Sequence, residues 1–82
     1  MDTSDKKVIF VTFISHYGAM LLKNRMGQCC TVRAVPRFLS SSCGTCACVE
    51  NSDLGEILKN ADSELLEAVY LKEKGEYVKI YG

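Results

Sequence analysis

Three of the chain's five cysteines fall within six residues, at Cys43, Cys46 and Cys48. Thiols this close together could hold a metal ion, form a redox pair, or carry sulfur on one nucleophilic thiolate. A free thiol has a pKa near 8.5, so it is mostly protonated at neutral pH unless cations or hydrogen-bond donors stabilise the anion. The residues around the cysteines therefore decide which chemistry the sequence favours.

The segment around Cys43 supplies groups that stabilise a thiolate. Arg37 lies six residues earlier, and Gly44 allows the backbone to turn its amides toward an anion. Hydroxyl groups that can donate to the same anion belong to Ser40, Ser41 and Ser42. Because Cys43 also lies in a loop next to an expected strand, we interpret it as a functional thiol. The alternative role is that of a small apolar residue in a loop or core.

Cys43 and Cys46 have the C-x-x-C spacing of a redox pair. In the thioredoxin arrangement this motif begins a helix, whereas strand-like residues follow it here, so the helix dipole is missing. Cys46 could still resolve an oxidised or persulfidated Cys43. A thiol-disulfide oxidoreductase is thus a third choice of function, and a carrier is favoured over a true enzyme.

Metal binding is the alternative from a different class. Zinc sites usually combine two well-spaced pairs of ligands, whereas C-x-C on a strand places both thiols along one face. The chain has one histidine, His16, which could act as a base or anion donor at the start of a helix. Metal binding or a non-enzymatic interaction through Cys43, Cys46 and Cys48 is therefore the competing hypothesis, and we expect no cofactor.

Length and composition predict one ordinary globular domain. The chain has 82 residues, an apolar fraction of 48%, and ten basic residues balanced by ten acidic ones. This balance argues against nucleic-acid and membrane partners. The apolar run over residues 8–14 is too short to cross a bilayer and lacks a cleavage site. We therefore expect a cytoplasmic protein with reduced thiols, and the odd number of cysteines disfavours a disulfide scaffold.

The hydrophobic pattern predicts a flexible N-terminus over residues 1–7 and a single α+β domain over residues 8–82. Helices are expected over 16–26 and 54–61, and strands over 8–14, 30–35, 45–49, 65–71 and 77–81. The order β-α-β-β-α-β is typical of a ferredoxin-like sandwich, in which two helices cover one face of an antiparallel sheet and leave the other open. The last strand is a short C-terminal addition. The expected face of the first helix comprises Tyr17, Met20, Leu21 and Asn24.

A register can also be predicted for the two strands that flank the loop. If Val35 lies opposite Gly44, then Arg33 lies opposite Cys46. Arg33, Cys46 and Cys48 would share the open face, where the cation favours thiolate or a homodimer covers the thiols.

The segment "VPRFLSSSCG", with the strand and helix before it, resembles the family of selenium/sulfur carrier-like proteins. The likeness runs from about Val8 to about Tyr70. It implies a cytoplasmic α/β domain in which Cys43 holds sulfur or selenium as a persulfide or selenopersulfide. Its signature residues are Pro36, Arg37, Ser40, Ser41, Ser42, Cys43 and Gly44, and it assigns no role to Cys29, Cys30 or Cys48.

We therefore expect a sulfur or selenium carrier. Cys43 would accept a sulfane atom from a donor such as a cysteine desulfurase and pass it to an acceptor protein. Arg37 and the serines would stabilise the terminal anion, and Cys46 would be the release thiol.

Overall fold

The computed structural model describes residues 8–36, 39, 44–50, 52–73 and 75–82, so the predicted flexible segment over residues 1–7 lies outside it. All the expected helices and strands are present, with ends that differ by a residue or two. The elements are β1 (Val8–Phe13), α1 (His16–Met26), the 3-10 turn η1 (Gly27–Cys29), β2 (Cys30–Ala34), β3 (Thr45–Glu50), α2 (Leu54–Asn60), β4 (Leu66–Glu73) and β5 (Glu76–Tyr81).

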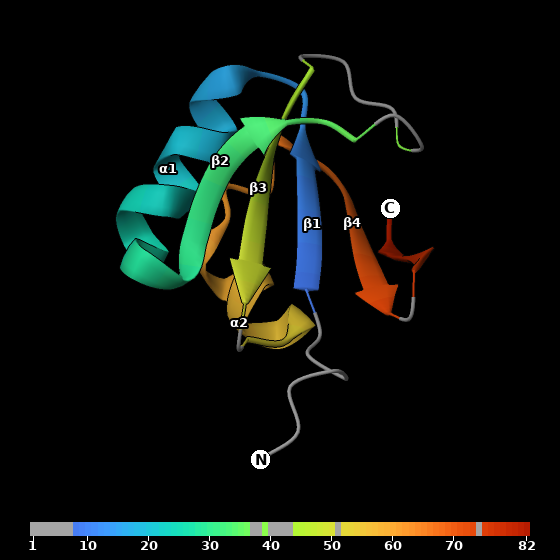
Figure 1. The fold of residues 1–82 in the computed structure, drawn as a ribbon. Helices are drawn as coiled ribbons and strands as arrows, with labels where there is room; N and C mark the ends of the chain where they lie inside the picture. Colours follow the sequence, from blue (N-terminus) through green and yellow to red (C-terminus); the bar gives the residue numbers. More distant parts are fainter. Residues whose placement is uncertain (1–7, 37–38, 40–43, 51, 74) are drawn as a thin grey trace.

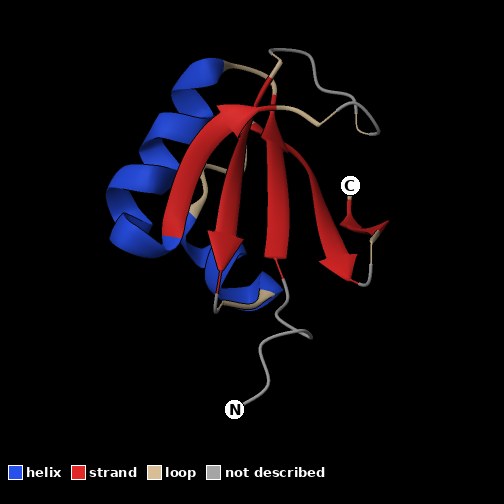
Figure 2. Ribbon diagram, viewed as in Figure 1, coloured by secondary structure: helices blue, strands red, loops and turns tan. Residues whose placement is uncertain are grey.

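The five strands form one antiparallel sheet in the order β2-β3-β1-β4-β5 (Figure 1). The central strand β1 pairs with β3 on one side and with β4 on the other. The two helices lie on one side of this sheet (Figure 2), so the chain is an α+β domain compatible with the predicted ferredoxin-like arrangement. The C-terminal strand β5 extends the sheet beyond β4.

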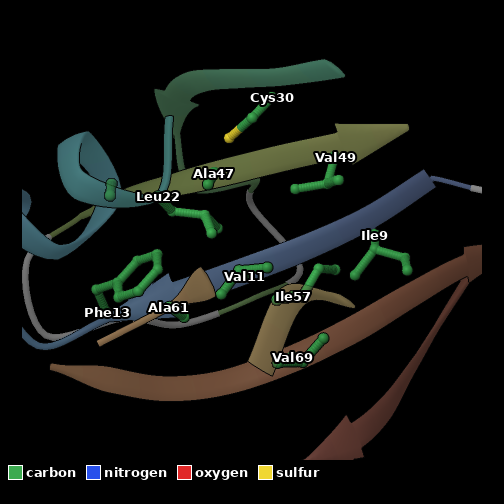
Figure 3. Packing of buried hydrophobic residues seen from close by; sticks show 11 residues of the cluster. Ile9, Val11, Phe13, Leu22, Cys30, Ala47, Val49, Ile57, Ala61 and Val69 are labelled. Carbon is green, nitrogen blue, oxygen red and sulfur yellow. The ribbon is translucent and has the colours of Figure 1, made fainter. Parts of the chain in front are cut away.

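The main core lies between the helices and the sheet (Figure 3). Side chains along β1 alternate between the two faces, because successive residues of a strand point in opposite directions. Ile9, Val11 and Phe13 belong to the cluster on the helical face, and they pack with residues of both helices. The cluster also contains Ala19, Leu22, Cys30, Ala47, Val49, Ile57, Ala61 and Val69.

The buried face of α1 differs from the face that the sequence indicated. Tyr17 is 64% exposed and Met20 is 41% exposed, whereas the buried residues of α1 are Gly18, Ala19 and Leu22. A β-carbon on Gly18 would lie only 2.6 Å from a ring carbon of Phe13, so the helix approaches β1 at the residue that has no side chain. With this face turned toward β1, Leu22 is buried and Tyr17 and Met20 are exposed.

The second face of the sheet was expected to be open, and this expectation is wrong for its centre. Phe10, Cys46 and Cys48 form a smaller buried cluster there. Leu39, from the connection between β2 and β3, packs against this cluster. The ring of Tyr77 packs edge to face against the ring of Phe10, with 5.5 Å between the ring centroids. The thiols are therefore covered within a single chain, and a homodimer through this face stays a prediction.

Replacing Gly18 with alanine tests the close approach of α1. We expect Gly18→Ala to lower the free energy of unfolding by about 1 to 2 kcal/mol, because an overpacked core outweighs the gain in helix propensity. Gly55→Ala is the matched control in α2, since its added β-carbon meets nothing closer than 3.6 Å. That control should raise the free energy of unfolding by up to about 1 kcal/mol. Urea unfolding measures both, and a stabilised Gly18→Ala variant would contradict this packing.

Candidate functional site

The connection between β2 and β3 is closed by a backbone hydrogen bond. The amide of Val35 donates to the carbonyl of Gly44 at 3.1 Å, which confirms the predicted pairing of these two residues. Gly44 has a φ of 75°, a conformation that glycine adopts without steric strain. The amide of Leu39 donates to the carbonyl of Pro36 at 3.0 Å, which forms a turn early in the connection.

Most of the predicted site falls in the part of this connection that the structure does not describe. Outside the described residues lie Arg37, Ser40, Ser41, Ser42 and Cys43. Their roles stay predictions from the sequence. The described part of the site consists of the two ends of the connection, the adjoining start of α1, and the thiols of β3.

The register of β2 and β3 agrees with the prediction. Arg33 lies opposite Cys46, and Thr31 lies opposite Cys48. Cys46 and Cys48 therefore occupy the same face of the sheet, across from the main core. The sequence had placed Arg33, Cys46 and Cys48 on one face, and the structure confirms that arrangement.

The thiol of Cys46 is fully buried. Its sulfur donates to the carbonyl of Ala34 at 3.8 Å, and Val35 and Leu39 belong to the apolar residues around it. For Cys46 to attack a persulfide, its sulfur would first have to leave this packing. The predicted role of Cys46 as a release thiol thus requires a local opening of the chain.

Cys48 shows how burial and charge compete at this face. Burial raises the pKa of the Cys48 thiol, whereas the charge of Arg33 and a hydrogen bond from its side chain lower it. The carboxylate of Glu50 raises the same pKa, and the ammonium group of Lys72 lowers it. Burial prevails, so the pKa of Cys48 lies above its usual value and the neutral thiol is the stable form at neutral pH.

The adjacent cysteines Cys29 and Cys30 lie at the other end of β2 from the connection. The thiol of Cys30 is buried in the main core, and this burial raises its pKa to about 11. The ammonium group of Lys23 opposes that shift and donates to the carbonyl of Cys30 at 3.1 Å. The thiol of Cys29 donates to the carbonyl of Met26 at 3.3 Å. Cys29 thus bonds within the turn from α1 into β2, whereas the side chain of Cys30 belongs to the main core.

His16 connects the start of α1 to the start of β3. Its Nδ1 atom lies 3.3 Å from the hydroxyl oxygen of Thr45, which follows Gly44 in the chain. The sequence indicated His16 as a helix-start residue but gave no sign of this contact, because the two residues are far apart along the chain. The contact places an exposed imidazole at the end of the sheet from which the β2–β3 connection leaves.

The described residues contain no group of three histidine, cysteine, aspartate or glutamate side chains that could hold a metal ion. Within the same ranges, the four cysteines are free thiols. No helix that the structure describes is long and apolar enough to cross a bilayer.

The fold and the described thiols define a small α+β domain with cysteines on both faces of its sheet and a cysteine-containing connection between β2 and β3. The chain belongs to the family described as "Putative Se/S carrier protein-like", whose match covers residues 9–81. This match confirms the resemblance inferred from the sequence and extends it through β5. Comparison with curated proteins and with solved structures gave no significant match.

The influence of Arg33 on Cys48 leads to a titration experiment. Arg33→Gln removes a charge and a hydrogen bond that favour the thiolate, so the pKa of Cys48 should rise further. Arg33→Lys keeps the charge and should give a smaller rise. The pH dependence of the Cys48 Cβ chemical shift measures the change, and identical titration of wild type and Arg33→Gln would show that the guanidinium does not act on this thiol.

The buried thiol of Cys30 makes stability depend on alkaline pH. Burial raises its pKa to about 11 in the folded chain, so its stabilising effect is complete below about pH 9 and is lost toward about pH 11. Over that interval the free energy of unfolding should fall by roughly 2 to 3 kcal/mol more in the wild type than in Cys30→Ala. Urea unfolding of both proteins across this range measures the difference. Parallel stability curves would mean that Cys30 ionises as easily in the folded chain as in the unfolded one.

Proposed function

We propose that this protein is a sulfur or selenium carrier that uses Cys43. Membership of the Se/S carrier-like family is the observation that carries this proposal. The sequence around Cys43 supports it, because Arg37 and the hydroxyl groups of Ser40, Ser41 and Ser42 are suited to stabilise a thiolate or a persulfide anion. The proposed compartment is the cytoplasm, where thiols stay reduced.

The proposed transfer is a thiol exchange that needs no external oxidant. The thiolate of Cys43 attacks the terminal sulfur of a persulfide on a donor such as a cysteine desulfurase. A bond forms between the sulfur of Cys43 and the terminal sulfur, the donor's sulfur–sulfur bond breaks, and the donor cysteine leaves as a thiolate. A nucleophile of the acceptor protein then attacks the same terminal sulfur, and Cys43 leaves as a thiolate. The acceptor thus receives one sulfane atom.

The proposed scaffold is ferredoxin-like, with β5 added at one edge. In this arrangement β2 and β3 are joined by a connection at one end of the sheet, and the Val35–Gly44 hydrogen bond fixes where that connection begins and ends. A carrier needs a thiol that a partner can approach, and a loop on a rigid sheet meets that requirement. It does not need a deep pocket, which suits a chain of 82 residues.

The environment of Cys46 favours direct transfer to the acceptor over release through a disulfide. Attack of Cys46 on persulfidated Cys43 would release hydrosulfide and leave a Cys43–Cys46 disulfide, which a cellular thiol would have to reduce. Cys46 is fully buried, and its thiol donates a hydrogen bond to the carbonyl of Ala34. Direct transfer leaves that packing intact and regenerates the Cys43 thiolate.

The competing proposal is a metal-binding or interaction domain. In the described residues Cys46 and Cys48 lie in an apolar cluster with Phe10 instead of facing one another across an open site. A metal site would therefore need Cys43 together with a rearranged β3. Metal analysis of protein purified without chelator separates the two proposals, because a metal lost in both Cys43→Ser and Cys46→Ser would favour the competing one.

Intact-mass analysis tests the carrier function. We expect the wild type, incubated with a cysteine desulfurase and cysteine, to gain the mass of one sulfur atom that a reducing thiol removes. Cys43→Ser should not gain it, whereas Cys29→Ser, the control at a half-buried thiol, should gain it like the wild type. A folded wild type that gains no sulfur, or an adduct that persists in Cys43→Ser, would remove Cys43 as the carrier residue.

A further inference from the structure

The second face of the sheet carries two tyrosines and two lysines on the neighbouring strands β4 and β5. Tyr70 is paired with Lys79 across the two strands. The adjacent pair on the same face is Lys72 with Tyr77. Both tyrosines pack against the buried cluster of Phe10, on the side of the sheet opposite the helices (Figure 2). We call the four residues of β4 and β5 the tyrosine–lysine surface.

Each lysine of this surface places its ammonium group over a tyrosine ring. The Nζ atom of Lys72 lies 5.5 Å from the ring centroid of Tyr77. The Nζ atom of Lys79 lies 5.9 Å from the ring centroid of Tyr70. Both tyrosines are partly buried, and Lys79 is exposed. The surface therefore combines aromatic rings that the cluster holds in place with cations directly beside them.

Arg33 of β2 adds a third cation to the second face. Its guanidinium and the ammonium group of Lys72 both act on the Cys48 thiol, and the carboxylate of Glu50 acts on it with the opposite sign. The hydrogen bond from Arg33 to Cys48 leaves other N–H groups of the guanidinium available to a ligand. In the described strands the register places Arg33, Lys72 and Lys79 on this face together with Glu50, so cations predominate. A partner that complements this face should therefore carry negative charge.

Aromatic rings bordered by cations favour a single-stranded nucleic acid as that partner. Successive bases stack on the rings, and the cations neutralise phosphates of the backbone. Sheets of RNA-binding domains hold two or three bases in this way. Tyr70 and Tyr77 lie diagonally across paired strands, where side chains are roughly 7 to 8 Å apart, so one strand of bases can use both rings. An acidic protein would use the lysines but would give the tyrosine rings no stacking partner.

Interaction strengths decide whether a base or an ammonium group occupies the rings. Stacking of a base on an aromatic ring is stronger than an exposed cation–π contact, so a base displaces the ammonium group. The flexible stem of a lysine then lets its cation turn toward a phosphate. RNA is the strand that fits best, since its loops, bulges and ends expose unstacked bases. The net charge of zero argues against a broad phosphate-binding surface, whereas this face suits a short contact with a few phosphates.

We propose that the tyrosine–lysine surface binds single-stranded RNA, with bases stacked on Tyr70 and Tyr77. The phosphates of the bound strand are neutralised by Lys72, Lys79 and Arg33. This inference goes beyond the proposed carrier function, and it uses no residue of the connection between β2 and β3. Binding is therefore measured on the reduced protein without a sulfur donor.

Fluorescence anisotropy of a short labelled oligouridine tests the proposal. Tyr70→Leu and Tyr77→Leu keep an apolar side chain but remove the stacking ring, so each should weaken binding by about 10-fold. Tyr70→Phe keeps the ring and should bind like the wild type. Tyr17→Leu is the matched control, because Tyr17 is 64% exposed in α1 on the helical side of the sheet, and it should also bind like the wild type. Circular dichroism confirms that each variant is folded.

The salt dependence of binding gives a second, independent measurement. The wild-type binding constant should fall as salt rises, with a slope of roughly −2 in a double-logarithmic plot, as expected for about three phosphate contacts. Lys79→Gln should weaken binding and reduce the slope to roughly −1.4, because one contact is lost. Lys59→Gln, the control in α2, removes an exposed lysine on the helical side and should change neither the affinity nor the slope.

Several results would overturn the RNA-binding surface. They are wild-type affinity in both leucine variants of the tyrosine–lysine surface, equal weakening in Tyr17→Leu, or a wild type that does not bind oligouridine at low salt. Inorganic polyphosphate that displaces the labelled RNA as well as unlabelled oligouridine does would show that charge alone acts. Equal displacement by polyglutamate would assign the surface to an acidic protein instead. Failure of Cys43 to accept sulfur would contradict only the carrier function.

Discussion

The burial of β1 on both faces is the constraint on which the rest of the structure depends. β1 pairs with β3 and β4, so its backbone groups find partners on both sides. Its side chains supply Val11 and Phe13 to the main core and Phe10 to the second cluster. The buried hydroxyl of Thr12 donates to the carbonyl of Ala68 at 3.2 Å, which satisfies a polar group that burial would otherwise destabilise.

This two-sided burial separates the thiols into different environments. Cys30 lies among aliphatic side chains under α1, and Cys46 and Cys48 lie on the reverse of the sheet. At Cys48 the cation of Arg33 is close enough to act, yet desolvation still decides the protonation state. A nearby positive charge is therefore insufficient to make a reactive thiolate. A nucleophilic thiol needs the cation together with access to water and to donors, which makes a loop a better place for it than this sheet.

Features encoded by neighbouring residues could be predicted from the sequence. The alternation of Thr45–Glu50, the pairing of Arg33 with Cys46, and the helix start at Asp53, whose carboxylate accepts from the amide of Glu56 at 2.9 Å, all follow from local patterns. The family could be predicted because its signature is a continuous segment.

Features that depend on distant residues could not be predicted in this way. The rotation of α1 depends on Gly18 meeting Phe13 and Leu65, which belong to three separate segments. The apolar positions of α1 suggested that the face around Tyr17 is buried. Periodicity predicts which residues share a face of the helix, but it does not predict which face can pack closely against the sheet. Leu39 packs on the second cluster from the connection beyond β2, and no periodic pattern indicates such a contact.

Net charge shows a similar limit of reasoning from composition. Ten basic and ten acidic residues cancel over the whole chain, which argues against a broad anionic partner. The acidic and basic residues are nevertheless unevenly distributed along the chain. No acidic residue lies between Asp5 and Glu50, and acidic residues outnumber basic ones in the rest of the chain. Because screening confines electrostatic forces to about 10 Å, a docking partner responds to the charges near its contact and not to the total. A neutral chain can thus contain a helix whose lysine and arginine have no acidic residue on the same element.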